Sequence, residues 1–543
     1  MVFARRSTTL LAAIIASCAM VLSLTACTSD NKTVVDGQTT VTSNSAGGVA
    51  VFTPSDGITL NQQTPLNKWA KLVPDLAKAL ADAGFKKGDI DHTTSDSLAK
   101  QSRAIQDFVV DHLSNNTTDD SGIAIAPDNM TLLVAPVVEA DASTRQYGDY
   151  VSQNLSTNDA TDGEATSDGE SSEDDSSKDD SFNTESDSTA SDEQAQAVDR
   201  LVSSLKLAKE SGMHVVLLGN SIEGYKPDAF VKFSDAQTIG KLQAEKMVSK
   251  LKLDKASKDN PKYIEVLLPY TAMDEKGNAN DSTFAQEAFR GIWQVLGSYY
   301  QKGVVESPSG TLDGKSTEND WQAVAYDAAK EGSTAKVLDK RLAKTDGQST
   351  LTRIDGIITM NDYIASEVVK ELDDLGYTGS AADINPQITI SGIVGNITGK
   401  KDLSRDAVPD PIKSPENDNA NDSSSSDDDA DKDTSASDKD RDSQWPLVTG
   451  YGAYVSNIPS IVNGKQWMTG MEDRQTIATD IAQACAKLNK DEALNSMPSI
   501  RNSEVGGVKK IPTISEPLLA VSASNLKSAL IDPGYISLAD AGL

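Results

Sequence analysis

Residues 214–251 read HVVLLGNSIEGYKPDAFVKFSDAQTIGKLQAEKMVSKL, and this stretch contains the strand and helix patterns that indicate the fold class. The continuously apolar run His214–Leu218 is typical of a strand in a parallel sheet that is covered on both faces. Residues 236–251 carry apolar side chains at helical spacing, which predicts a helix. One α/β pattern is therefore complete by Gly219, and a second begins after Phe233.

Upstream of this stretch, short β-branched runs alternate with helical patterns. The sequence predicts strands at residues 49–52 and 130–138 and helices at residues 69–83, 98–113 and 196–209. Strands that alternate with helices indicate a parallel sheet with helices on both faces. The first half of the chain therefore predicts one α/β lobe.

The same alternation repeats downstream. It predicts a strand, two helical regions, a second strand and a helix at residues 263–268, 283–299, 323–340, 354–359 and 364–375. A further strand is predicted at residues 447–450, with residues 388–393 as the alternative. Two α/β units of similar size suggest two doubly wound lobes with a cleft between them. Ligands of open parallel sheets bind outside the carboxyl ends of the strands. That rule nominates the loops at residues 53–56, 219–223, 270–273, 361–362 and 450–451.

The charge of the chain is concentrated in two tracts that cannot form a core. Residues 157–194 hold 14 acidic residues and one basic residue, and residues 415–442 hold 11 acidic and three basic residues, so together they carry −21 of the formal charge of −31. Composition predicts acidic disordered insertions at residues 157–194 and 401–443. The total charge of −31 argues against nucleic acid as a partner, and the sequence outside the two tracts is only mildly acidic.

The N-terminus predicts export. Arg5 and Arg6 precede an apolar run at residues 10–24, which is too short for a convincing membrane span but suits a secretory leader. The run ends in Leu24-Thr25-Ala26-Cys27, which resembles the lipobox of bacterial lipoproteins. We therefore expect a signal peptide at residues 1–26, lipid on Cys27, a flexible stalk at residues 27–48 and an extracytoplasmic location on the membrane surface.

The sequence contains little that favours catalysis. His92, His112 and His214 show no metal-ligand spacing, and the lone Cys485 lies in a helical pattern that suits a buried small hydrophobe. Residues 219–224 follow a strand, but their G-x-S-x-x-G spacing is not that of a nucleophile elbow. The nucleotide-binding motifs G-x-x-x-x-G-K-[ST] and G-x-G-x-x-G do not occur. We expect a binding protein with no catalytic residues, cofactor or metal.

Several segments resemble, in order, the bacterial sugar-binding proteins of the ribose, xylose and multiple-sugar type that serve ABC importers. They include VAVFTPS, KWAKLVPDLAKALADAGF, IDGIITMNDYIASEVVKELDDLGYTG and WPLVTGYGAYVSNIPSIVNGKQWMTGMEDRQTIATDIAQAC. The resemblance runs from Val49 to Tyr535, apart from the two acidic tracts. It implies the type I periplasmic-binding-protein fold, in which two doubly wound lobes are joined by three crossings and close on a ligand.

The resemblance also implies domain boundaries. Lobe 1 would comprise residues 49–232 and 471–507, and lobe 2 would comprise residues 233–470 and 508–543. The crossings would fall near Phe233, near Gly470 and between Lys490 and Lys509.

Candidate ligand-binding residues come from the resemblance and from the nominated loops. Trp69 and Asn361-Asp362 match cleft positions of the family, and Trp321 matches a second cleft Trp; an aromatic face packs on sugar C–H groups, and Asn and Asp bind hydroxyls. Trp69 could equally be a core anchor, and Asn361-Asp362 could be a helix N-cap. The nominated loops add the following candidates: Asn220, Ser221 and Tyr451.

Other positions depart from the family pattern. Asn220-Ser221 stands where an Asp-Arg pair is usual, Tyr451-Gly452 stands where Gln-Asp is usual, and Glu472 replaces a Lys. Charge-assisted bonds to a sugar would be lost at these positions. The leading hypothesis is a lipid-anchored receptor that captures a sugar or another small polar solute for an ABC permease. The alternative is a surface-tethered sensor or scaffold that keeps the fold without transport.

Overall fold

The structure of the protein is a computed structural model. It describes residues 34–35, 38–39, 46–55, 65–115, 125–138, 142–151, 153–157, 185–273, 279–328, 330–343, 351–381 and 445–543. The chain divides into two units, Met1–Asn44 and Ser45–Leu543. In the first unit, β1 (Val34–Val35) pairs antiparallel with β2 (Gln38–Thr39), within the predicted stalk. The remaining elements belong to the second unit.

Lobe 1 is built on a seven-stranded sheet with the order β17-β18-β9-β7-β5-β3-β4. All neighbouring strands are parallel except β17 and β18. The first strand in sequence lies between the second and the third, which is the doubly wound order. The strands are β3 (Gly48–Pro54), β4 (Ile90–Ser95), β5 (Met130–Val134), β7 (His214–Leu218), β9 (Ala229–Lys232), β17 (Ile500–Val505) and β18 (Val508–Ser515).

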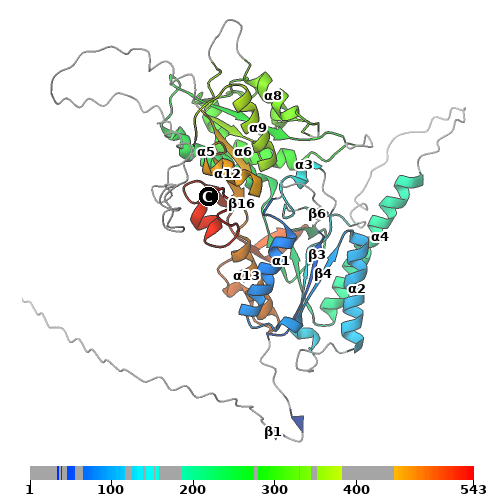
Figure 1. Ribbon diagram of the computed structural model, residues 1–543. Helices are drawn as coiled ribbons and strands as arrows, with labels where there is room; N and C mark the ends of the chain where they lie inside the picture. Colours follow the sequence, from blue (N-terminus) through cyan, green and yellow to red (C-terminus); the bar gives the residue numbers. More distant parts are fainter. Residues whose placement is uncertain are drawn as a thin grey trace, which may run out of the picture. The chain divides into compact units, whose positions relative to one another are not determined.

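Helices cover both faces of this sheet, as Figure 1 shows. On one face lie α1 (Trp69–Asp82) and α13 (Arg474–Leu488), and on the other lie α2 (Leu98–Asn115) and α4 (Glu185–Glu210). The strands are apolar on both sides: in β3, Val49 and Val51 pack with α1, whereas Ala50 and Phe52 pack with α2. This two-sided burial is why the strands have continuous apolar runs.

Lobe 2 repeats the plan on a six-stranded sheet with the order β12-β10-β14-β15-β16-β19. Only β19 is antiparallel to its neighbour. The strands are β10 (Lys262–Val266), β12 (Val305–Glu306), β14 (Gly356–Ile358), β15 (Leu447–Tyr451), β16 (Met468–Met471) and β19 (Leu519–Ser522). One face of the sheet is covered by α5 (Ala236–Leu251) and α6 (Thr283–Gln301). The other face is covered by α8 (Ser333–Arg341) and α9 (Asp362–Asp374).

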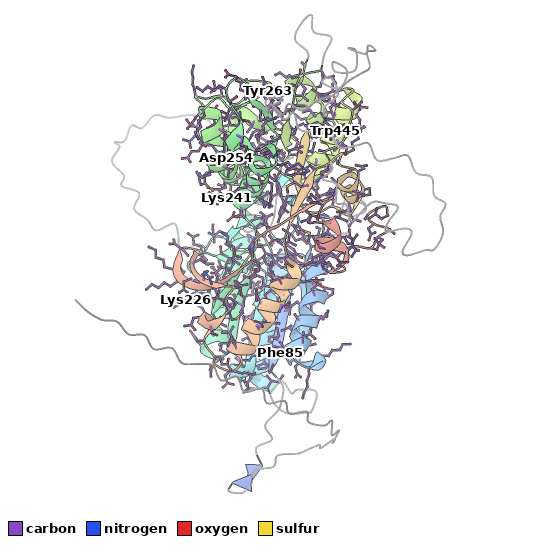
Figure 2. All side chains as sticks on the ribbon, turned by 90° about the vertical axis from the view of Figure 1, so that its left-hand side faces the viewer. Phe85, Lys226, Lys241, Asp254, Tyr263 and Trp445 are labelled. Atoms are coloured by element: carbon purple, nitrogen blue, oxygen red, sulfur yellow. The ribbon has the colours of Figure 1, made fainter. Side chains whose placement is uncertain are left out.

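Short elements complete the two lobes. In lobe 1, β6 (Asn154–Leu155) pairs with β8 (Ser221–Ile222), and in lobe 2, β11 (Leu268–Pro269) pairs with β13 (Ala325–Tyr326). The short helices are α3 (Ala142–Arg145), α7 (Trp321–Val324) and α12 (Ile458–Val462). Figure 2 shows the side chains of both lobes, with Phe85 from the α1 side of lobe 1 and Trp445 from the α9 side of lobe 2. The predicted fold class, α/β with two doubly wound lobes, is confirmed.

Helices α5 and α6 approach closely because both carry glycine at their contact. A Cβ atom on Gly240 would lie 2.2 Å from the Ala288 carbonyl oxygen, and one on Gly291 would lie 2.0 Å from the Gln237 carbonyl oxygen. Real atoms cannot approach to these distances, so the two backbones can pack together only where no side chain stands between them.

The chain crosses between the lobes three times. It enters lobe 2 after β9 at residues 233–235, and it returns to lobe 1 between β16 and α13 at residues 472–473. The third crossing corrects the sequence-based boundary. Residues 508–515 were assigned to lobe 2, but β18 pairs with β9 through Thr513 and Phe230, so the chain stays in lobe 1 until Ser515.

Three further expectations are corrected. The predicted acidic insertion at residues 157–194 is too long, because α4 begins at Glu185. The helix predicted at residues 323–340 is split into α7, β13 and α8, because residues 325–326 pair with β11. The strand predicted at residues 130–138 ends at Val134, two residues before Pro136.

Some expectations concern residues outside the described part of the chain. The tract at residues 401–443 and the predicted lipid site Cys27 both lie there. Among the residues that the structure describes, no helix is long and apolar enough to cross a membrane.

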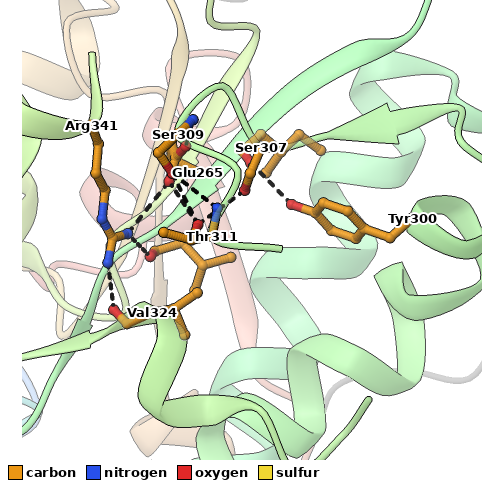
Figure 3. A network of polar contacts seen from close by, with 9 residues as sticks. Glu265, Tyr300, Ser307, Ser309, Thr311, Val324 and Arg341 are labelled. Atoms are coloured by element: carbon orange, nitrogen blue, oxygen red, sulfur yellow. Dashed lines mark hydrogen bonds and ion pairs between the residues drawn. The ribbon is translucent and has the colours of Figure 1, made fainter. Parts of the chain in front are cut away.

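Lobe 2 contains a buried ion pair beneath α8, shown in Figure 3. The Arg341 guanidinium lies 3.4 Å from the Glu265 carboxylate, and it also donates to the Val324 carbonyl oxygen at 2.9 Å. The Ser309 amide donates to the same carboxylate at 2.9 Å. Burial raises the pKa of Glu265, and the hydrogen bonds from Ser309 and the charge of Arg341 oppose this shift. The pair fastens α8 and the loop after β12 onto strand β10.

Candidate functional site

The lobes meet at the carboxyl ends of their strands through residues 144–151, which follow β5 and which we call the interlobe arm. Its Gln146 side-chain oxygen accepts a hydrogen bond from the Asn361 amide nitrogen at 3.1 Å. The Tyr454 hydroxyl donates to the Gln146 carbonyl oxygen at 2.7 Å. Asn361 follows β14 and Tyr454 follows β15, so a segment of lobe 1 lies where the rule for open parallel sheets places a ligand.

The arm also inserts an aromatic side chain into lobe 2. Tyr147 is 1% exposed and belongs to the apolar cluster of α5 and α6. Its ring centroid lies 4.7 Å from that of Phe284 and 6.3 Å from that of Tyr451. Burying an aromatic side chain contributes on the order of 2–3 kcal/mol, so Tyr147 is a substantial contact between the lobes.

The other end of the arm is fixed to lobe 1. The Asp149 carboxylate accepts hydrogen bonds from the Lys68 ammonium at 2.8 Å and from the Trp69 amide at 3.1 Å, at the N-terminus of α1. A carboxylate is favourable there because it faces the positive end of the helix dipole. Gly148 has a φ of 99°, and a Cβ atom on it would lie 2.6 Å from the Asn67 carbonyl oxygen. This turn therefore requires glycine.

A second polar cluster joins the first two crossings. The Ser234 amide of the first crossing donates to the Glu472 carboxylate of the second at 2.6 Å. The Tyr451 hydroxyl donates to the same oxygen at 3.3 Å, and the Glu472 amide donates to Asn67 at 3.4 Å. Burial raises the pKa of Glu472 to about 6, opposed by the hydrogen bonds from Ser234 and Tyr451, while nearby Asp235 raises it further. Glu472 is therefore a carboxyl group at the hinge whose pKa lies above its ordinary value.

The carboxylate of Asp362 is engaged entirely within lobe 2. One oxygen accepts from the Gln466 amide at 2.7 Å, and the other accepts from the Tyr454 amide and the Thr469 hydroxyl, each at 2.9 Å. Burial raises the pKa of Asp362 to about 6, and these hydrogen bonds oppose the shift. Asp362 thus holds the loop after β15 in place, and this loop carries Tyr454.

Asn361 has two roles in the structure. Its side-chain oxygen accepts from the Ile364 amide at 2.9 Å and so caps α9, while its side-chain nitrogen reaches Gln146. The cap and the interlobe position, which were alternatives in the sequence, are both present. Tyr451 lies at the end of β15 with its hydroxyl 2.5 Å from that of Ser234.

The other predicted residues lie apart from Asn361. Trp69 is buried in the lobe 1 core, with its ring centroid 5.1 Å from Tyr150 and 5.7 Å from Phe233. Trp321 is 8% exposed and packs edge-on against Tyr270 at 5.2 Å.

The Asn220-Ser221 pair joins neighbouring loops of lobe 1. The Asn220 side chain accepts from the Gln153 amide at 3.0 Å and donates to the Pro136 carbonyl oxygen at 2.9 Å. The Ser221 hydroxyl donates to Asn154 at 2.8 Å. The structure therefore brings Asn361, Tyr451 and Trp69 to the arm, and it places Asn220 and Ser221 at the base of the segment that follows the arm.

Sequence reasoning missed the residues that join the lobes at this point. Gln146, Tyr147 and Tyr454 were not nominated, although the rule that chose the other loops also applies to the loop after β5. The signal was present in the sequence, because residues 144–151 read TRQYGDYV and carry two tyrosines beside a glycine.

A small recess lies beside the arm. It has a volume of about 10 Å³ and is lined by residues of the β11 loop and of the start of α6, which include Tyr270, Asn280 and Phe284. This volume admits about one water molecule. Within the described residues, no group of three or more His, Cys, Asp or Glu side chains could hold a metal ion.

Comparisons with known proteins find similarity in structure. No family model matches the chain, and no curated protein matches its sequence. The structure matches an ABC-transporter solute-binding protein from Clostridium phytofermentans with bound β-D-glucose, at 17% identity and a TM-score of 0.44, covering 91% of this chain and 99% of that one. It also matches a carbohydrate-transporter solute-binding protein from Chloroflexus aurantiacus in complex with D-glucose, at 18% identity and a TM-score of 0.43, covering 92% and 98%.

A third match is an arabinose-binding protein from Geobacillus stearothermophilus, at 9% identity and a TM-score of 0.40, covering 89% of this chain and 99% of that one. All three are described as binding proteins.

Proposed function

We propose that the protein is an extracytoplasmic solute-binding protein of an ABC importer, anchored by lipid on Cys27, which captures a sugar or a related small polar solute between its lobes. The observation that carries the proposal is the juxtaposition of two doubly wound sheets whose carboxyl ends meet beside Asn361 and Tyr454. Amide and phenol groups bind hydroxyl groups as donors or acceptors. Three crossings are the connection that permits hinge closure.

One observation favours the alternative, a surface-tethered sensor or scaffold without transport. Asp362, a predicted ligand-binding carboxylate, is saturated by donors of its own lobe. Ligand pockets typically have volumes on the order of 300–1,000 Å³, far larger than the recess beside the arm. Solute binding therefore requires the lobes to open first.

A thermal-shift screen tests the proposal. Residues 28–543 would be screened against pentoses, hexoses, oligosaccharides and polyols at millimolar concentration. A solute at a thousandfold excess over its Kd adds about 4 kcal/mol to the free energy of unfolding. A shift with one class of sugar would support a receptor, whereas partner-protein binding without any solute response would support the scaffold.

A pair of variants locates the binding. Asn361→Asp keeps the oxygen that caps α9 and removes the nitrogen that faces the arm, so it should weaken the solute response while keeping the fold. Ser298→Ala, at an exposed position of α6, is the control and should leave the response unchanged. Equal responses in both variants would place the solute elsewhere.

The lipid anchor has its own test. Mass spectrometry of the N-terminal peptide from bacterial membranes should show an acylated Cys27, because the preceding Leu-Thr-Ala fits a lipobox. Cys27→Ser should release the protein from the membrane fraction. A Cys27→Ser protein that remains in the membrane fraction would contradict lipid anchoring.

A further inference from the structure

The interlobe arm occupies the place of a ligand. Gln146 pairs with Asn361 at 3.1 Å and its carbonyl oxygen accepts from Tyr454 at 2.7 Å, so both side chains that the proposed site offers to a solute are bound to the arm. Tyr147 fills an apolar position in lobe 2, where a sugar's C–H face would otherwise pack.

The arm is held from both sides. Asp149 ties it to Lys68 and the start of α1 in lobe 1, while Gln146 and Tyr147 contact lobe 2. A segment anchored in one lobe and buried in the other resists separation of the two. It reproduces the bridging that a bound solute provides in a closing receptor.

We propose that the interlobe arm is a built-in occupant that keeps the lobes closed in the absence of solute and that must leave lobe 2 before a solute can bind. Closure by the arm is independent of the proposed function, whereas displacement by a solute depends on it. The Gln146 carboxamide and the Tyr147 ring are the groups that a solute has to replace.

A cross-linking experiment tests closure in the full chain. Gln146→Cys and Asn361→Cys place one thiol on each side of the contact, and a short bifunctional thiol reagent is added without any sugar. Peptide mapping distinguishes the 146–361 product from products of the native cysteines, which are Cys18, Cys27 and the buried Cys485. The control pair combines Asn361→Cys with Lys100→Cys, whose side chain is 66% exposed on the outer helix α2.

If the arm holds the lobes closed, positions 146 and 361 should cross-link rapidly in buffer alone. Cross-linking no faster than in the control pair would overturn the proposal. Asn361→Cys removes the oxygen that caps α9, so the thermal unfolding of each cysteine variant is compared with that of the wild type before the rates are interpreted.

Truncation of the aromatic contact provides a second experiment. Tyr147→Ala in the Asn361→Cys background should speed labelling of the buried position 361 by a monofunctional thiol reagent at least about tenfold, since removing a buried aromatic side chain costs more than the 1.4 kcal/mol that a factor of ten represents. Tyr299→Ala, at a half-buried tyrosine of α6 that bonds Asp254, should leave the rate unchanged. Equal rates in the two variants would contradict the proposal that Tyr147 holds the arm in lobe 2.

Added solute separates this proposal from the proposed function. A sugar that gives a thermal shift should slow the 146–361 cross-link, because it displaces the arm. A sugar that shifts the thermal midpoint without slowing the cross-link would refute displacement and leave solute binding intact. Rapid cross-linking together with silence across the sugar panel, in the wild type and also in Tyr147→Ala, would leave closure by the arm standing and refute sugar binding.

Discussion

The buried carboxylate of Glu472 makes folding stability depend on pH in an unusual direction. Burial raises its pKa from 4.5 to about 6 in the folded protein. The folded state therefore holds this proton more tightly than the unfolded state does. The resulting stability is fully present below about pH 4.5 and is lost as the pH rises through about 6.

The size of the effect follows from the two pKa values. Between about pH 5 and about pH 7.5, linkage predicts a loss of about 1 kcal/mol from this one group. For lobes of this size, 1 kcal/mol corresponds to roughly 2–4 °C in the thermal midpoint. Asp362, whose pKa is also raised to about 6, contributes in the same direction.

The substitution Glu472→Gln isolates the group. Glutamine keeps the shape and an acceptor oxygen for the Ser234 amide, but it cannot ionise. Thermal unfolding is measured for both proteins at several pH values. Relative to the wild type, Glu472→Gln should gain about 1 kcal/mol between about pH 5 and about pH 7.5, because the Asp362 contribution cancels in the comparison. Glu504→Gln, at an exposed position of β17, is the control. Parallel pH profiles for wild type and Glu472→Gln would refute the assignment of a shifted carboxylate to the hinge.

Two further predictions concern the architecture. Arg341→Met should lower the free energy of unfolding by about 3–5 kcal/mol, because it leaves the buried Glu265 carboxylate without its charge partner; chemical denaturation measures this, and the double variant with Glu265→Gln should recover part of the loss. Gly291→Ala should cost at least about 1–3 kcal/mol, because its Cβ would lie 2.0 Å from the Gln237 carbonyl oxygen of α5. In the same assay Ser298→Ala, on the exposed side of the same helix, should change stability by less than about 0.5 kcal/mol, and similar losses for the two α6 variants would contradict the close helix contact.

The fold could be predicted because its strands and helices follow local patterns that repeat. The run His214–Leu218 and the helix Ala236–Leu251 have the lengths and periods of the elements that they form. The predictions fail where pairing between distant segments determines which sheet a strand joins. Strand Val508–Ser515 could be assigned to lobe 1 only from its partner β9, which lies far away in the sequence.

The site was less accessible to sequence reasoning, and the reason is physical. Asn361 was found because a polar pair directly after an apolar strand lies at the carboxyl end of that strand. Gln146 and Tyr147 were missed because the arm does not follow β5 directly. The intervening residues conceal, in the sequence, that the chain comes back to the carboxyl ends of the strands. The network around Asp362 was also hidden, because its donors come from β16, from Gln466 just before β16 and from Tyr454 in the loop after β15.

The occupied interface bears on the choice between receptor and scaffold. When a binding-competent state is only a fraction of the population, the apparent Kd is the intrinsic Kd divided by that fraction. If the arm leaves lobe 2 in about one molecule in a thousand, a solute of micromolar intrinsic affinity would show a millimolar Kd. A weak response in a sugar screen would then reflect the cost of moving Gln146 and Tyr147 and would not show that the site lacks affinity. Because Tyr147→Ala removes much of that cost, a receptor should bind its solute more tightly after this substitution, whereas a scaffold should gain no solute binding at all.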